Sequence, residues 1–204
     1  MNDDELKSYF HLYLERGRDA VLWKLDGLSE YDIRRPMTAT GTNLLGLVKH
    51  LTYGEGWYFG NCFDRPFPEP LPDWAEDDPE PNSDMYARAD EAREDVVAKY
   101  RRSCAHADET IAALPLNATG FVPWWPPERA HATLGRLLVH VATETHRHAG
   151  HADIVRELID GAAGVSPANS NLPEVEDDFW PSYVERLEQI AREFREGERP
   201  ARRW

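Results

Sequence analysis

Apolar residues recur at intervals of three and four along most of the chain, and this spacing predicts amphipathic α-helices. A first helix is predicted to follow Asn2, because Asn2 and Glu5 have the spacing of a capping box, and to run to about Gly27. A second is predicted to follow Thr42 and to end near Phe59. Both helices would therefore begin after a side chain that can cap them.

Three later stretches have the same period. One covers about residues 83–114, and another runs from about Thr133 to Gly161, where glycine is a natural C-terminal stop. The last opens at Pro181. The residues of this last helix that are predicted to point inward are Tyr183, Val184, Leu187, Ile190, Ala191 and Phe194.

Segments rich in turn-forming residues separate these helices. Residues 29–41, 64–82 and 115–132 are predicted loops, since they hold Arg-Arg-Pro, clustered prolines and Trp-Trp-Pro-Pro respectively. The acidic cluster at 73–80 is interpreted as a solvated surface and not as a cation site. No strand pattern, internal repeat or second domain is visible, so the fold class is predicted to be all-α.

Four main helices with one long crossover match the pattern of a four-helix bundle, in which sites are built from inward side chains of facing helices. The 204 residues are enough for one sizeable core. We therefore expect residues 1–165 to form the bundle. Residues 166–204 are expected to form a linker, a fifth helix and a tail packed on the same domain.

The net charge of the chain argues against two classes of binding partner. A formal net charge of −14 at pH 7 argues against general binding to nucleic acid or to anionic membranes, which attract basic surfaces. No apolar run approaches the roughly twenty residues that span a bilayer, and the acidic N-terminus does not resemble a signal peptide. Cys62 and Cys104 are isolated, without a CxxC or a disulfide framework. These features predict a cytoplasmic protein.

The predicted helix at 133–161 carries polar side chains on its apolar face. That face is marked by Leu134, Leu137, Leu138, Val141, Val155, Leu158 and Ile159. At about 100° per residue, four polar residues fall in a narrow arc of the same face: His140, Glu144, His148 and His151. A buried carboxylate is costly unless it is paired or binds a metal. His146 and Asp153 point the opposite way and are expected to face water.

We hypothesise that a divalent metal is bound by His50, Glu144 and His148. Glu144 and His148 are four residues apart, so their β-carbons lie roughly 6 Å from each other on one helix face. His50 lies at the edge of the apolar face of the second helix. Two histidines and one carboxylate leave positions open for water or substrate, as catalytic sites require. Zinc, nickel and iron all accept these ligands, with zinc slightly preferred.

Several other residues can support the metal ligands or contact substrate, and for each of them a purely structural role stays open. His140 and His151 lie one turn to either side of the proposed ligands and suit roles behind the ligands or facing substrate. Glu55 can either support His50 or form an ion pair within the bundle, and we favour the ion pair. Trp57 and Trp125 can wall a pocket or simply fill the core. The histidines themselves can also be core residues satisfied by hydrogen bonds.

Several familiar catalytic motifs are absent from the sequence. There is no G-x-S-x-G, no phosphate-binding glycine loop and no G-x-G-x-x-G. Neither cysteine is near the histidine-rich face in the sequence, and both are interpreted as small buried hydrophobes. A serine or cysteine nucleophile is therefore not predicted.

Three stretches resemble the DinB-like superfamily, which includes mycothiol-dependent maleylpyruvate isomerase. They are residues 41–51, the Trp-Trp-Pro-Pro that begins at Trp124, and residues 140–161. The resemblance implies an up-down-down-up four-helix bundle with a divalent metal in a central cleft. Its first ligand, a histidine of the second helix, matches His50. The other two form an i,i+4 pair that matches Glu144 and His148, and the isomerase is similar in having glutamate first.

The resemblance also implies a chemistry. Characterised relatives use a low-molecular-weight thiol, such as mycothiol or bacillithiol, as cosubstrate for transfer, isomerisation or detoxification. The metal would bind the thiol sulfur and lower its pKa, and the thiolate would attack an electrophile in the cleft. This chain differs from the isomerase in having only one further helix after the bundle.

We therefore expect a metal-dependent thiol S-transferase or isomerase that acts on a small electrophile. The alternatives are a non-catalytic, stress-related protein that binds a metal or small ligand, and a purely structural bundle. The expected partner is a small molecule, without nucleic acid or membrane. The fifth helix and the tryptophan-rich loops can supply the surface of a homodimer.

Overall fold

The computed structural model describes residues 2–71 and 80–195 of the chain. Its α-helices are α1 (Asp3–Trp23), α2 (Glu30–Arg34), α3 (Leu44–Phe59), α4 (Arg93–Ala113), α5 (Leu134–Asp160) and α6 (Phe179–Glu193). Two short 3-10 helices, η1 (Asn61–Phe63) and η2 (Ser83–Met85), and two strands, β1 (Thr119–Phe121) and β2 (His131–Thr133), complete the elements. Most of the acidic cluster at 73–80 and the C-terminal tail lie outside the described residues.

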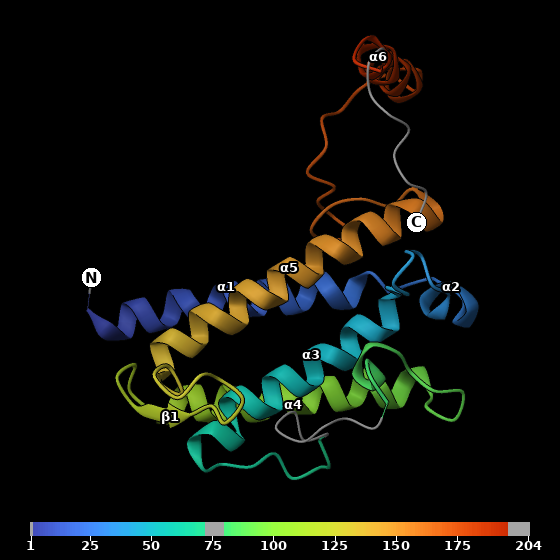
Figure 1. The fold of residues 1–204 in the computed structure, drawn as a ribbon. Coiled ribbons are helices and arrows are strands. Elements are labelled where there is room, and N and C mark those ends of the chain that lie inside the picture. The colour runs from blue at the N-terminus through green and yellow to red at the C-terminus, as the bar shows by residue number, and fades with distance from the viewer. Residues whose placement is uncertain (1, 72–79, 196–204) are drawn as a thin grey trace. The chain divides into compact units, whose positions relative to one another are not determined.

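Four long helices, α1, α3, α4 and α5, form the predicted bundle (Figure 1). α1 packs along α5, α3 packs along α4, and α3 also contacts α5. α1 and α5 run in one direction and α3 and α4 in the other, which is the up-down-down-up order. The prediction of an all-α DinB-like bundle is confirmed. Because α3 and α4 are parallel, the chain between them returns along the length of the bundle.

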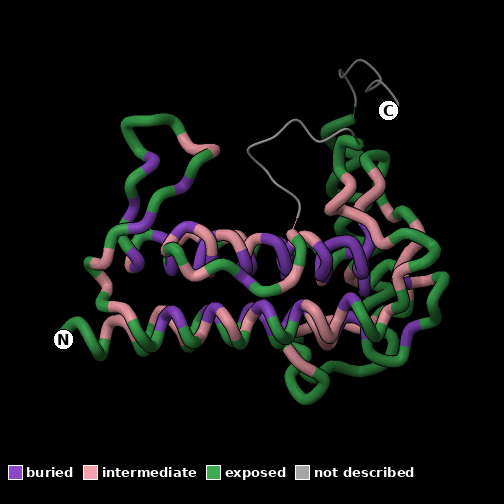
Figure 2. The backbone as a smooth tube through the Cα atoms, turned by 90° about the horizontal axis from the view of Figure 1, so that it is seen from below, coloured by how far each residue is buried: buried purple, intermediate pink, exposed green. Residues whose placement is uncertain are grey.

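Most of the buried residues belong to the long helices of the bundle (Figure 2). Leu134, Leu137, Leu138, Val141 and Val155 are buried, as the apolar face of the fourth predicted helix requires. Leu158 was predicted on the same face but is 63% exposed. The prediction was wrong because Leu158 points about 60° away from Val155 around the helix.

Several helix ends follow from the predicted caps. Asn2 and Glu5 form the capping box at the start of α1. Thr133 caps α5, and α5 ends at Gly161, whose φ of 79° is in the left-handed region that favours glycine. The cap of α3 is Asn43 and not Thr42, since the Asn43 side chain accepts from the Gly46 N–H.

Two other helix predictions are corrected by the structure. The predicted loop at 29–41 contains α2, whose first turn is capped by Ser29. The predicted helix at 83–114 begins only at Arg93, and η2 stands near the start of that range. η2 is held against α3, because the Asn43 side-chain amide donates to the Met85 carbonyl. This contact with a distant helix keeps residues 83–85 from joining α4.

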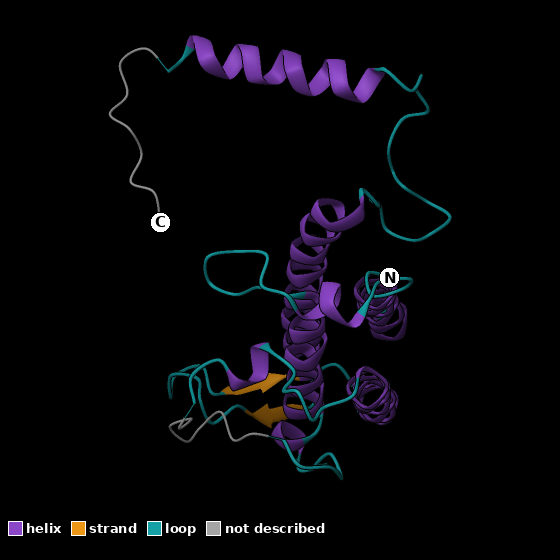
Figure 3. Ribbon diagram, turned by 90° about the vertical axis from the view of Figure 1, so that its right-hand side faces the viewer, coloured by secondary structure: helices purple, strands orange, loops and turns teal. Residues whose placement is uncertain are grey.

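The structure also contains a small β-hairpin that the sequence did not predict (Figure 3). β1 and β2 pair antiparallel, with Gly120 opposite Ala132. Strands of three residues are too short to show an alternating pattern, which explains the missed prediction. A Cβ on Gly120 would lie 2.6 Å from the Cys62 carbonyl oxygen, so glycine is needed for the hairpin to lie against η1.

The described residues from 171 to 195 belong to a separate compact unit. Within it, α6 begins at Phe179, two residues before the predicted start at Pro181. The packing of this helix on the bundle stays a prediction. None of the helices in the described ranges is both long and apolar enough to cross a membrane.

Candidate metal centre

The fold brings the three predicted metal ligands together. His50 comes from α3, and Glu144 and His148 come from α5. One donor atom from each residue lies within 4.8 Å of the other two. The i,i+4 spacing places Glu144 and His148 on one helix face, and the contact between α3 and α5 adds His50.

The distances fit a shared divalent ion. Nε2 of His148 lies 2.9 Å from Oε1 of Glu144, and Nε2 of His50 lies 4.0 Å from the same oxygen. Two ligands on a tetrahedral ion with bonds of about 2.1 Å are about 3.4 Å apart, between these two values. Two imidazole nitrogens and a carboxylate oxygen are also a donor set that zinc, nickel and iron accept. The residues present therefore fit such an ion after small side-chain movements.

Two of the candidate ligands, His50 and Glu144, lie at the wall of a cavity of about 270 Å³. Its other walls include Leu51, Gly54 and Tyr58. The His148 side chain is 9% exposed, whereas that of Glu144 is 36% exposed. A Cβ added to Gly54 would meet no atom within 4 Å, so the glycine keeps this side of the cavity open. The donors are thus covered on one side and accessible on the other.

Asp84 supports His50 and was missed from the sequence. The Nδ1–H of His50 donates to Oδ2 of Asp84 at 2.6 Å, which leaves Nε2 as the ligand atom. Burial opposes ionisation of Asp84, but its hydrogen bond with His50 outweighs this effect and holds its pKa below the usual 3.8. In the sequence, Asp84 lay near the start of the predicted helix at 83–114, and nothing in its spacing linked it to His50. Only the contact of η2 with α3 brings it to His50.

The ring of His148 contacts a second imidazole, that of His151. Nδ1 of His148 lies 3.3 Å from Nδ1 of His151, so one imidazole donates and the other accepts. Burial and the nearby His50 lower the pKa of His148 below 6.5. The neutral imidazole is the form that binds metals. His151 was predicted to support the ligands or to face substrate, and it contacts His148 while remaining exposed.

Tyr58 links His140 to the tryptophans at the end of the cleft. Its hydroxyl accepts from Nε1 of both Trp124 and Trp125 at 3.3 Å and lies 3.1 Å from Nε2 of His140. A phenol oxygen that accepts two bonds donates its own hydrogen, so Nε2 of His140 accepts and its proton is on Nδ1. Burial also lowers the pKa of His140. Trp57 packs edge-on against Trp124, with ring centroids 5.4 Å apart.

Glu55 does not line the cleft. Both of its carboxylate oxygens accept from Arg18 at 2.7 Å, and its side chain is 1% exposed. Arg18 also donates to Asp108, which is bonded to His11. Glu55 therefore has the ion-pair role that the sequence favoured, between α1, α3 and α4.

Two polar residues were predicted on the outer side of α5, and they differ in their exposure to solvent. His146 is exposed, as predicted, and its Nε2 donates to the Tyr13 carbonyl. Asp153 is half-buried, because it pairs with the fully buried Lys24 at 2.6 Å. The Asp153 side chain is still 43% exposed, so it faces water in part, and its pairing with Lys24 is what the sequence did not show.

Both cysteines are free thiols. Burial raises the pKa of Cys62 to about 12 and raises that of Cys104 well above its usual value. Such thiols are weak nucleophiles near neutral pH. This agrees with the absence of a predicted cysteine nucleophile.

The fold and the convergent donors define the class of the protein: a DinB-like helical bundle with a group of residues that can hold a metal ion. The Mycothiol-S-transferase family model matches residues 9–161. The chain therefore belongs to the mycothiol S-transferase family, a DinB-like family. No match is found among curated proteins.

Proposed function

We propose that the protein is a metal-dependent S-transferase that joins a low-molecular-weight thiol, such as mycothiol, to a small electrophile. The observation that carries this proposal is the convergence of His50, Glu144 and His148, the first two of which line a cavity, in a chain of the mycothiol S-transferase family. A purely structural bundle would not need donors that are accessible to a second molecule.

The three donors would hold a divalent ion, with zinc preferred over nickel and iron. When bound, the ion supplies a Lewis acid that lowers the pKa of a thiol so that the thiolate form is available near neutral pH. In the transfer, the S–H bond breaks and an S–C bond forms. The thiol proton leaves to water, and the leaving group departs from the electrophilic carbon with its electron pair.

The residues of the chain have separate tasks in this proposal. Asp84 fixes the ring of His50, so that Nε2 is aimed at the other two donors. Tyr58 fixes the ring of His140 at the cavity wall. The apolar side chains of Leu51 and Val141 exclude part of the water from the cavity.

His148→Ala tests the proposal, with His146→Ala as the matched control on the same helix. His146 is exposed and does not line the cavity. We expect the unaltered protein and His146→Ala to hold about one divalent ion per chain by elemental analysis. His148→Ala should lose that ion, and its thiol transfer should fall to the uncatalysed rate.

Two outcomes would contradict the proposal. The first is that the unaltered protein takes up no divalent ion on titration, and the second is that it binds the ion tightly but does not join any thiol to an electrophile. The second outcome would favour the alternative of a non-catalytic binding protein. Isomerase activity, cytoplasmic location and a homodimer stay predictions.

A further inference from the structure

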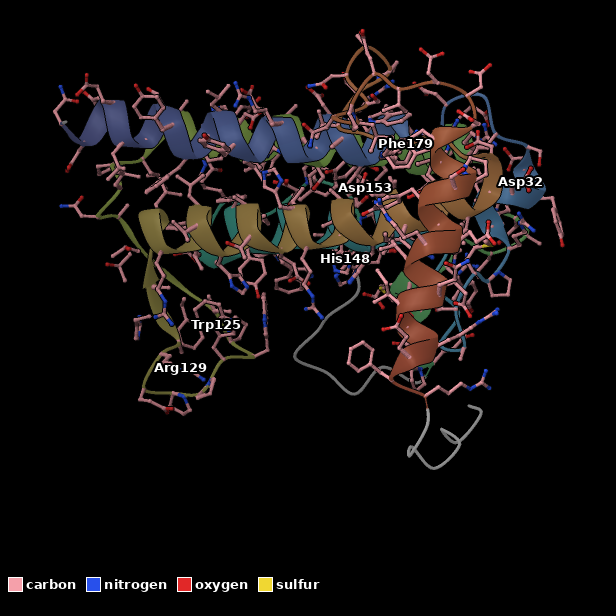
Figure 4. The ribbon with its side chains drawn as sticks, turned by 90° about the horizontal axis from the view of Figure 1, so that it is seen from above. Asp32, Trp125, Arg129, His148, Asp153 and Phe179 are labelled. Atoms are coloured by element: carbon pink, nitrogen blue, oxygen red, sulfur yellow. The ribbon has the colours of Figure 1, made fainter. Side chains whose placement is uncertain are left out.

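A second hollow lies beside the cavity that His50 and Glu144 line. Its volume is about 500 Å³, and its walls include Trp125, Arg129, Arg136, Val139 and His140. Trp125 and Arg129 belong to the loop between β1 and β2, and Arg136 and His140 belong to α5. Figure 4 shows Trp125 and Arg129 on this loop beside one end of α5, with His148 farther along the helix.

The charge of this hollow is opposite to that of the whole chain. The chain has a net charge of −14, yet two arginines and no acidic residue line the hollow. Buried arginines of the bundle, such as Arg18 and Arg156, are paired with carboxylates. Among the described residues, Arg129 and Arg136 pair with no carboxylate. Two arginines that line one hollow and pair with no carboxylate favour the binding of an anion there.

The position of Arg136 is fixed by its neighbours. Its guanidinium carbon lies 4.7 Å from the centroid of the Trp125 ring, which is a cation–π contact. Its Nη1 donates to the Arg129 carbonyl at 3.4 Å, and its backbone N–H donates to the Thr133 cap. A guanidinium carries five N–H donors, so those not used in these contacts stay available to a carboxylate.

The hollow adjoins the cavity of the metal centre along α5. His140 lines both cavities and is midway between Arg136 and Glu144. Arg136 and Glu144 are eight residues apart, or about 12 Å at 1.5 Å per residue, and their side chains can shorten the gap. One small molecule can therefore contact Arg136 at one end and reach the metal cleft with the other.

We propose that the electrophile of this transferase carries a carboxylate, and that Arg136 and Arg129 bind this group while Trp125 and Val139 contact its apolar part. This inference rests on the proposed function for the reacting end of the molecule. The reaction joins the thiol sulfur to the electrophilic carbon of the bound acid and releases the leaving group as an anion.

Matched probes test the inference. The probes are para-(bromomethyl)benzoate and its methyl ester, which share the reactive carbon and differ in the carboxylate charge. Thiol attack forms a thioether and releases bromide from both. The metal-loaded protein should favour the acid over the ester in kcat/KM after correction for the uncatalysed rates. Arg136→Gln should lower kcat/KM for the acid roughly tenfold, mainly through KM, and leave the ester nearly unchanged.

Arg16→Gln is the matched control. Arg16 is an exposed arginine stacked on Tyr13, outside the hollow, with its guanidinium carbon 5.4 Å from the ring centroid. This variant should keep the preference for the acid. Equal use of acid and ester by the unaltered protein, or an equal loss for both in Arg136→Gln, would overturn the inference.

A binding measurement separates failure of this inference from failure of the proposed function. The unreactive acid para-toluate is titrated into the protein by calorimetry, so no turnover is needed. If neither bromide is turned over but para-toluate binds and Arg136→Gln weakens its Kd roughly tenfold, the anion site stands and the transferase proposal fails. If para-toluate binds the unaltered protein and Arg136→Gln equally, or binds neither, the anion site is refuted.

Discussion

The donor residues of the candidate metal centre are brought together partly by local helix geometry and partly by contacts between distant elements. Glu144 and His148 meet because they are one helical turn apart, so local geometry is sufficient. His50 reaches them only through the packing of α3 against α5. The acidic residue behind His50 comes from a third element, η2. At the residue scale, the position of Asp84 therefore depends on contacts between elements and not on local helix geometry.

Asp84→Asn should weaken metal binding without abolishing it. The substitution removes the carboxylate that holds Nδ1–H of His50, and comparable losses behind metal ligands cost about 10–100-fold in affinity. Competition with a chelator of known affinity measures the change. Asp90→Asn is the control, because Asp90 is exposed and pairs with Arg88. An unchanged affinity in Asp84→Asn would show that His50 needs no support.

At the scale of elements, the approach of η2 to α3 decides where Asp84 lies. A Cβ on Gly46 would lie only 1.8 Å from the Met85 carbonyl oxygen. Glycine at this position therefore permits a backbone contact that no other residue would allow. The same contact holds residues 83–85 against α3, whereas α4 starts at Arg93.

Gly46→Ala should destabilise the fold and weaken metal binding together. Because the added methyl must displace η2, we expect a loss of about 1–3 kcal/mol in the free energy of unfolding. Gly54→Ala on the same helix is the control for stability, since its Cβ would meet no atom within 4 Å. Alanine there should raise stability by about 0.5–1 kcal/mol. Chemical denaturation measures both changes, and an undisturbed Gly46→Ala protein would contradict the role given to this contact.

At the scale of the whole molecule, a charged network joins three helices of the bundle. Arg18 of α1 pairs with Glu55 of α3 and with Asp108 of α4, and Asp108 accepts from His11 of α1. Burial opposes ionisation of Asp108, but His11 and Arg18 outweigh it and hold its pKa below 3.8. The hydrogen bond to Asp108 raises the pKa of His11 above 6.5.

These two shifts predict a pH window for stability. Asp108 contributes stability above its unfolded pKa of 3.8, and this contribution is lost as pH falls through its lower folded value. His11 contributes below its unfolded pKa of 6.5, and its contribution is lost as pH rises through its higher folded value. Both contributions are present between these two pH values.

Asp108→Asn should therefore lower Tm by a few degrees, and most strongly inside that window. The difference in Tm from the unaltered protein should shrink at lower pH, where Asp108 is protonated, and should decrease in part at higher pH, where His11 is neutral. Thermal unfolding followed by circular dichroism across this range measures the difference. A difference that does not vary with pH would show that Asp108 acts by packing and not by charge.

The sequence predicted the parts of the fold that repeat along the chain. The long helices, the capping box at Asn2 and the stop at Gly161 follow from local patterns. The short elements were missed: α2, η2 and the hairpin of β1 and β2 have too few residues to show a period. Their positions are fixed by contacts with other parts of the chain, such as Gly120 against η1.

By itself, the sequence determined the family, the four long helices and the pairing of Glu144 with His148, because helical periodicity is a local property that one chain displays. Only the tertiary structure decided that Asp84 supports His50, that Glu55 pairs with Arg18, and that the hairpin loop places Trp125 over Arg136. Each of these contacts joins separate elements. Their geometry depends on how helices pack and where loops return, which no local pattern encodes.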